Sequence, residues 1–177
     1  MEIVLDTLRA EFSDLADPAA FTRIAMRLLL AVLLAGIIGY ERELRGTSAG
    51  LRTHMMVGLG VALLVAAASE SRMDPADLSR VIQGVVAGIG FLGAGAIIKQ
   101  DEKEQVKGLT TAASIWTTAA IATAAGLGRE ATAILATVLA VVILALLLRL
   151  ERHLARGRSS TTAAKSGGQR VEDRRAR

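Results

Sequence analysis

Five long apolar stretches separated by short polar segments dominate the hydrophobic pattern of this chain. They cover residues 21–40, 51–69, 78–98, 109–125 and 129–150, and the fourth is the shortest and the richest in Thr and Ala. Each is close to the roughly 20 residues that an α-helix needs to cross about 30 Å of hydrocarbon. The pattern predicts an all-α membrane protein, a bundle of five transmembrane helices, with a tight turn at Gly126-Leu127-Gly128 between the last two.

The segments on either side of residues 21–150 have a different character. Within residues 1–20, apolar side chains fall on one helical face, which predicts a short interfacial helix ending near Pro18: Ile3, Val4, Leu8, Phe12 and Leu15. Residues 151–177 are rich in Arg, Ser and Gly with almost no large apolar side chain, so we expect a disordered basic tail. No segment resembles a removable secretory signal.

The distribution of Lys and Arg predicts the orientation of the helices. With five spans, fifteen of the basic residues fall on the side that holds the tail and six on the other side. Because cytoplasmic loops are enriched in Lys and Arg, we expect a multi-pass protein of a bacterial inner membrane with its amino terminus outside and its carboxy terminus in the cytoplasm. The tail would then lie near anionic lipids.

Composition narrows the possible functions. The chain is 52% hydrophobic with a mean hydropathy of +0.44, and it has no Cys and two His. Disulfides, thiol catalysis and Cys-based metal sites are therefore excluded. The net charge of +4 belongs to the tail, so nucleic acid is not an expected partner. No nucleophile–base pair, phosphate-binding loop or metal-ligand set appears, and we predict neither an enzyme nor a cofactor.

Glycines crowd the third apolar stretch. Gly84, Gly88 and Gly95 share one helical face, while Gly90 and Gly93 lie on nearly the opposite face. Since small residues let helices approach closely in lipid, we expect this helix at the centre of the bundle with neighbours on two sides. The alternative is a broken helix whose carbonyls bind an ion, although no acidic residue lies nearby in the stretch.

Three polar residues, Asp77, Arg80 and Gln83, follow one side of the same helix at its start. The spacing lets Asp77 pair with Arg80, and the deeper Gln83 would need a partner in another helix. One interpretation is an interfacial cap with an interhelical hydrogen bond. The other makes these residues the outer wall of a binding site.

The first loop concentrates charges at the ends of two adjacent helices. Glu41, Arg42, Arg52 and His54 are placed so that carboxylate–guanidinium pairs can form across the turn. Competing Arg side chains make a magnesium site less favourable than a structural network, a lipid head group or another anionic partner. Just upstream, Gly36-x-x-Gly39 offers a close-packing face, which makes a homodimer plausible.

The fourth stretch begins with Thr110 and Thr111 and contains Trp116. Its hydroxyls can cap the helix, bond across helices or line a polar crevice, and Trp116 lies too deep for an interface belt, so we expect it to fill a gap in the core. No Asp or Glu lies deep inside any span, whereas ion pathways usually need one.

Together these motifs resemble the MgtC/SapB family of bacterial inner-membrane proteins over residues 22–150. The matching runs, in order, are Gly39-Tyr-Glu-Arg-Glu43, Ala49-Gly-Leu-Arg-Thr-His54, Asp77-x-x-Arg80-x-x-Gln83 leading into Gly88-Ile-Gly-Phe-Leu-Gly-Ala-Gly95, and Gly108-Leu-Thr-Thr-Ala-Ala-Ser114-x-Trp116. The resemblance implies functional roles at ten matching positions: Glu41, Arg42, Arg52, His54, Asp77, Arg80, Gln83, Thr110, Thr111 and Trp116.

The resemblance also implies a function in magnesium homeostasis. Members of this family are linked to growth at low magnesium and, in pathogens, to survival inside phagocytes. The family was first described as magnesium transporters; regulation of other membrane proteins, including ion-motive ATPases, fits the absence of carboxylates inside the spans better. The best-known members carry a soluble carboxy-terminal domain that we do not find here, so roles of that domain are not transferred. Two hypotheses stand: a regulator, or a transporter of Mg²⁺ or another small solute.

Overall fold

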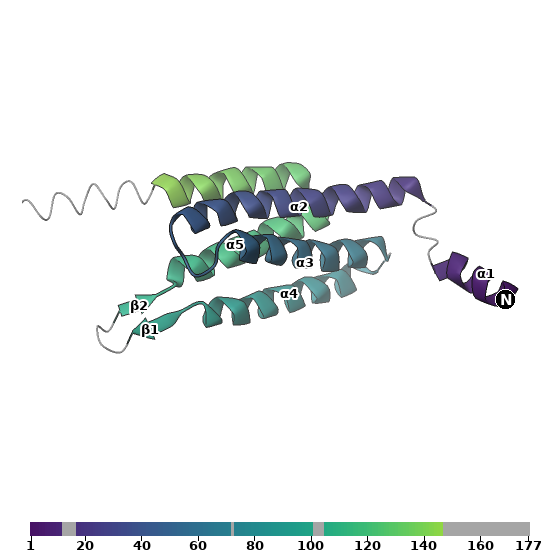
Figure 1. Cartoon of the computed structure of the whole chain (residues 1–177), viewed down its shortest axis with the longest axis horizontal. Helices are drawn as coiled ribbons and strands as arrows, with labels where there is room; N and C mark the ends of the chain where they lie inside the picture. The colour runs from purple at the N-terminus through teal and green to yellow at the C-terminus, as the bar shows by residue number, and fades with distance from the viewer. Residues whose placement is uncertain (12–16, 72, 101–104, 147–177) are drawn as a thin grey trace, which may run out of the picture. The chain divides into compact units, whose positions relative to one another are not determined.

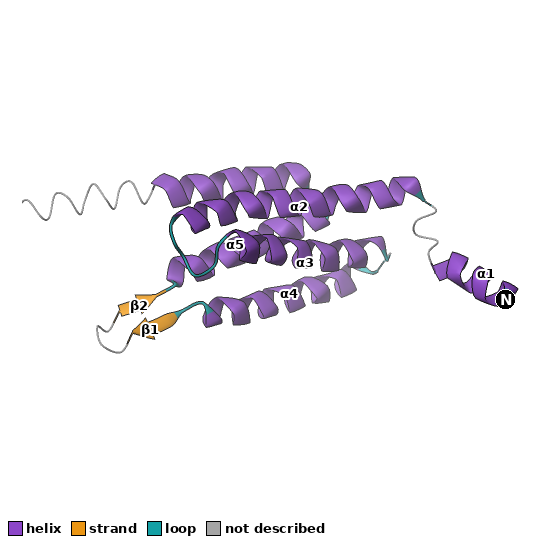
Figure 2. Ribbon diagram, in the orientation of Figure 1, coloured by secondary structure: helices purple, strands orange, loops and turns teal. Residues whose placement is uncertain are grey.

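The computed structural model describes residues 1–11, 17–71, 73–100 and 105–146, and it is almost entirely helical (Figures 1 and 2). The elements are α1 (Glu2–Glu11), α2 (Pro18–Leu44), α3 (Leu51–Glu70), α4 (Pro75–Gly95), β1 (Ile98–Gln100), β2 (Gln105–Lys107) and α5 (Leu109–Gly126), followed by a further helix, Glu130–Leu146. The chain divides into two compact units, Met1–Ala140 and Val141–Arg177, and the boundary falls inside this last helix. The predicted disordered tail, residues 151–177, lies outside the described residues.

Pro18 begins a helix, whereas the sequence analysis placed the end of the first helix near it. The carboxylate of Asp17 accepts hydrogen bonds from the backbone N–H groups of Ala19 and Ala20, at 3.0 and 3.1 Å. Proline suits the first helical position because its missing N–H would have no partner there. This cap and Pro18 together start α2, the longest helix among those described.

A short antiparallel hairpin joins α4 to α5, and the sequence analysis did not predict it. β1 and β2 pair with Lys99 opposite Val106, and α4 ends at Gly95, earlier than the predicted 98. Gly108 follows with φ of +94°, and a Cβ there would lie 2.0 Å from the carbonyl oxygen of Ala96. Only glycine fits this close return of the chain. The α2–α3 turn lies at the same end of the bundle as this hairpin (Figure 1), and we call this end of the bundle the hairpin end.

Helices α3 and α5 are central among the labelled helices, because each packs against the other and against both α2 and α4. The buried side of α5 is made of small residues and Ile, including Ser114, Thr118 and Ala122. By contrast α4 buries only Val85, Ile89 and Gly93. The prediction that the glycine-rich α4 occupies the centre is therefore wrong, although α4 does have two helical neighbours, α3 and α5. Of its glycines only Gly93 has a contact, with Ala112; a Cβ on the other four would meet nothing within 4 Å: Gly84, Gly88, Gly90 and Gly95.

Close backbone approach instead occurs between α2, α3 and α5. A Cβ on Gly58 of α3 would lie 2.6 Å from the Cβ of Ala35 on α2, and one on Gly126 would lie 2.9 Å from the carbonyl oxygen of Ala62. Gly39 of α2 similarly faces the start of α3, where an added Cβ would lie 2.9 Å from that of His54. The Gly36-x-x-Gly39 face proposed for a homodimer is thus already occupied by α3.

Three helices, α2, α3 and α4, are long and apolar enough to cross a membrane. Helix α5 has 18 residues and contains six Thr or Ser, and the described part of the last helix is a shorter apolar segment, Glu130–Leu146. Helices thus occupy the regions of all five predicted apolar stretches, and three of these helices are candidate membrane spans. The turn between α5 and the last helix forms as predicted, with Gly128 at φ of +71°.

We expect Gly58→Ala to lower the free energy of unfolding by about 1–3 kcal/mol, because the new methyl group would overlap Ala35 in a packed interface. The measurement is unfolding of the purified protein by SDS in mixed micelles, followed by circular dichroism. Gly60→Ala is the matched control, since its methyl group meets nothing within 4 Å and alanine favours the helix. Equal losses in the two variants would contradict this packing.

Candidate functional site

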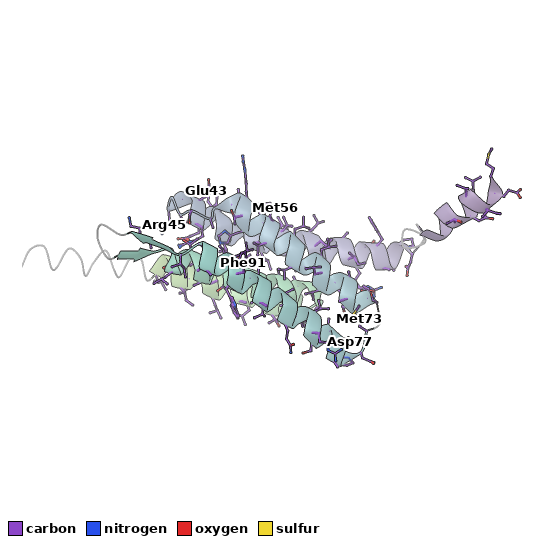
Figure 3. The ribbon with its side chains drawn as sticks, turned by 90° about the horizontal axis from the view of Figure 1, so that it is seen from below. Glu43, Arg45, Met56, Met73, Asp77 and Phe91 are labelled. Carbon is purple, nitrogen blue, oxygen red and sulfur yellow. The ribbon has the colours of Figure 1, made fainter. Side chains whose placement is uncertain are left out.

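Polar side chains gather at the hairpin end, and we call this group the hairpin-end cluster: Glu41, Arg42, Arg45, His54, Thr111 and Ser114. It draws on the end of α2, the first turn of α3 and the start of α5. Figure 3 shows Glu43 and Arg45 at this end and Asp77 at the other.

Glu41 is the acidic centre of the part of the cluster on α2. It accepts a hydrogen bond from Arg42 Nε at 2.6 Å and another from Arg45 Nε at 2.9 Å. Arg42 is almost fully buried, with 4% of its side chain exposed, and Glu41 is 13% exposed. Both oxygens of this carboxylate are therefore engaged by guanidinium groups, which strengthens the pairs and leaves little capacity for a metal ion.

His54 is fully buried and connects α3 to α5. Its Nδ1 lies 2.8 Å from the carbonyl oxygen of Gly50, so this nitrogen carries the proton and donates. Its Nε2 lies 3.2 Å from Ser114 Oγ, and the same hydroxyl lies 2.8 Å from the carbonyl oxygen of Thr111. When the imidazole is neutral, Ser114 can donate its single hydroxyl proton either to His54 Nε2 or to the carbonyl oxygen of Thr111.

The side chain of Glu43 caps the amino-terminal end of α3. Gly50, the residue before α3, has no side chain to accept a hydrogen bond, and the Glu43 carboxylate accepts one from Leu51 N–H at 3.0 Å instead. The hydroxyl of Thr47 is 2.9 Å from the carbonyl oxygen of Arg42. These contacts fix the start of α3 and hence the position of His54.

A second group of charges ties the helices together at the opposite end. Arg27 of α2 donates to Glu70 at 3.2 Å and to the carbonyl oxygen of Gly126, at the end of α5, at 3.4 Å. Arg23 lies 3.6 Å from the same carboxylate. These three residues did not emerge from the sequence analysis, because the partners are far apart in the chain and only the fold brings them together.

The structure separates the other candidates from this cluster. Asp77 and Arg80 pair at 2.7 Å, as their spacing predicts, and both are exposed. Gln83 and Thr110 are exposed, and in the described part of the chain Gln83 has no hydrogen-bond partner in another helix. Arg52 is exposed and does not pair with Glu41 across the turn as predicted.

Trp116 also departs from the prediction. It is 50% exposed and lines a hollow between α4 and α5, so it does not fill a gap in the core. On α5 it is Ile115 and Ala119 that face the core, since both are buried.

Two members of the cluster were missed by sequence reasoning although a signal existed. Arg45 stands four residues after Glu41, the spacing of a helical ion pair. Ser114 stands three residues after Thr111 on the same helical face, which predicts a shared environment but not the contact with His54. Among the residues that the structure describes, no group of three or more His, Cys, Asp or Glu is placed to hold a metal ion.

Comparison with known proteins gives the family. Residues 28–153 match the MgtC family. The chain belongs to this family. It is 40% identical over 126 residues to the "Putative magnesium transporter YhiD" of Escherichia coli K12, 39% identical over 140 residues to protein SrpB of Synechococcus elongatus, and 44% identical over 117 residues to protein MgtC of Brucella abortus. No solved structure gives a significant match.

The matches cover different shares of each relative. They include 67% of this chain and 58% of YhiD, 73% of this chain and 77% of SrpB, and 66% of this chain and 48% of the Brucella MgtC. The chain thus spans about half the length of MgtC and somewhat more of YhiD. The region that matches the family, residues 28–153, contains the hairpin-end cluster and α4.

We expect Ser114→Ala to lower the free energy of unfolding by about 1–3 kcal/mol, because the fully buried His54 would lose the partner of its Nε2. SDS titration in mixed micelles measures the change. Thr117→Ala is the control on the same helix: its hydroxyl bonds only the carbonyl oxygen of Ala113, and we expect a change within about 0.5 kcal/mol. A Ser114→Ala variant as stable as the control would show that the His54 contact contributes nothing.

Proposed function

We propose that this protein acts in magnesium homeostasis as a regulator of other inner-membrane proteins, such as ion-motive ATPases, and adapts cells to low magnesium. Membership of the MgtC family supports the link to magnesium. One observation supports regulation over transport: the carboxylates of Glu41, Glu70 and Asp77 are each paired with Arg rather than free to bind a cation. Glu70 joins α3 to Arg23 and Arg27 of α2, whereas Glu41 and Asp77 pair with arginines one to four residues away, and in each case the cation partner of the carboxylate is an Arg side chain.

The proposal includes a full membrane topology. The five helices would all cross the inner membrane, with the amino terminus outside and the hairpin end in the cytoplasm, where Arg42, Arg45 and Arg52 satisfy the preference for basic loops. Helices α2, α3 and α4 support this arrangement by length and hydropathy.

Helix α4 offers the contact surface for a partner. Gln83 is exposed in a helix that qualifies as a membrane span. Small residues continue along the helix from it, Ser79, Ala87, Gly90 and Ala94, with Val86 beside them. An amide in hydrocarbon is costly without a hydrogen-bond partner, and small residues allow another helix to come close. A helix of a partner protein would meet both requirements.

The second candidate function is transport of Mg²⁺ or another small solute. The name of the YhiD relative favours it. The experiment that separates the two functions is Mg²⁺ uptake into proteoliposomes that contain this protein alone. We expect no uptake above that of empty vesicles. Uptake that falls in an Asp77→Asn, Arg80→Ala double variant would establish transport and contradict regulation as the main activity.

Gln83→Leu tests the contact surface. In a strain whose own gene has been deleted, we expect the wild-type chain to restore growth at low Mg²⁺ and the Gln83→Leu variant to fail, because the partner helix loses its hydrogen bond. The stability of the variant should change by less than about 0.5 kcal/mol, since the side chain is exposed. Leu33→Ala, at another exposed position, on α2, should restore growth. Full growth with Gln83→Leu would show that the function does not need Gln83.

A further inference from the structure

The start of α3 holds a titratable side chain where two helices nearly touch. His54 has no exposed surface, and its imidazole has no part in the function proposed above. A Cβ on Gly39 of α2 would lie 2.9 Å from the Cβ of His54 and 2.9 Å from the Cα of Leu51. The backbones of α2 and α3 are therefore close together here, and the imidazole has no contact with water.

Hydrogen bonding by itself accepts the imidazole of His54 in either protonation state. Nδ1 donates to the carbonyl oxygen of Gly50 in both states. In the neutral ring, Nε2 can accept a hydrogen bond from Ser114; in the charged ring, Nε2 donates to Ser114 Oγ. The hydroxyl proton of Ser114 then turns to the carbonyl oxygen of Thr111, 2.8 Å away. The hydrogen bonds thus do not decide whether His54 is charged.

Burial and a neighbouring cation decide it, because both oppose a charge on His54. An ion that has no contact with water loses its hydration. Arg42 lies one turn after Gly39 on the same buried side of α2, and 4% of its side chain is exposed. Its guanidinium would repel an imidazolium on the adjacent helix. Glu41 pairs with Arg42, but the same carboxylate also pairs with Arg45.

The other elements offer no buried anion to His54 within the described residues. Helix α5 contains no Asp, Glu, Lys, Arg or His, and Asp77 of α4 lies at the opposite end (Figure 3). Further charged groups near this end of the bundle are exposed: Glu43 and Arg45 of α2, Arg52 of α3, and Lys107 just before α5. The carboxylate of Glu43 is engaged by Leu51 N–H. Since water and salt screen exposed charges, they do not offset the burial of an imidazolium.

We propose that His54 is a proton-sensitive switch at the hairpin end. While neutral, it holds residues 49–54, the switch segment, against α2 and α5. When it takes up a proton from water, the segment is released, because the charge is hydrated only after the segment has moved away from Gly39 and Arg42. The switch goes beyond the proposed function, and it holds for a regulator and for a transporter alike.

Acid therefore favours the released state. An imidazole in water has a pKa of about 6.5, and in the held state the ring of His54 stays neutral. Lowering the pH from about 7.5 to about 5.5 then multiplies the ratio of released to held molecules by about ten. The stabilisation of the held state is complete above this ordinary pKa, and it decreases as the pH falls below it.

Labelling of engineered cysteines in the full chain measures the release. The chain has no Cys, so Ala49→Cys places a single thiol at a buried position of the switch segment. Ser48→Cys places one at the exposed neighbouring position. Each is treated in detergent micelles with a charged methanethiosulfonate reagent at the two pH values. The ratio of the two labelling rates cancels the dependence of thiol reactivity itself on pH.

We expect the labelling rate at Cys-substituted Ala49, relative to that at Ser48, to rise about tenfold on acidification. In a His54→Asn background the ratio should not change, because the amide can donate to the Gly50 carbonyl oxygen but does not titrate. His153→Gln is the matched control, since it removes the other His of the chain, and it should leave the rise intact.

Two labelling results would overturn the proposal: a ratio that does not change with pH in the wild-type background, and an equal rise in the His54→Asn background. Nitrogen NMR of the His153→Gln chain with isotope-labelled histidine tests it without any change at His54, and so holds even if His54→Asn does not fold. We expect a neutral ring at about pH 7.5 with the proton on Nδ1. An imidazolium at this pH would overturn the proposal as well.

Discussion

The close approach of α2, α3 and α5 is the constraint on which the rest of the molecule depends. In lipid there is little hydrophobic drive between helices, so association relies on van der Waals packing and polar contacts. The interfaces are accordingly built from residues with almost no side chain. Gly58 faces Ala35, Gly126 faces the backbone of Ala62, and Ala122 is fully buried. A larger residue at any of these positions would separate the helices.

Polar groups are enclosed because the helices lie so close. His54 has no exposed surface, and its hydrogen bonds join the start of α3 to Ser114 on α5. At the opposite end, Arg27 connects α2 to Glu70 of α3 and to the end of α5. Directional contacts at both ends therefore fix the rotation of helices that small residues alone would allow to slide. The cost of burying each group is offset only while its partner is present.

Helix α4 is mostly exposed, in contrast to the closely packed α2, α3 and α5. The protein therefore has a packed part, made of these three helices, and an exposed part, α4. Its ion pair between Asp77 and Arg80 is open to solvent, and most of its glycines have no contact. We infer that α4 carries the surface for another molecule, a partner helix at Gln83. Both parts lie within residues 28–153, the region that matches the MgtC family.

Helical segments, the family and contacts between near neighbours could be predicted from the amino-acid sequence, because hydropathy and helical spacing act locally. Asp77 pairs with Arg80 for this reason. The packing of the helices accounts for the peripheral position of α4, for the exposure of Trp116 and for the contact of His54 with a serine sixty residues away. The physical reason is that a helical period defines faces but not which faces meet. A small or apolar residue satisfies a lipid contact as well as a protein contact, so glycines on α4 and alanines on α5 look alike until the helices are packed.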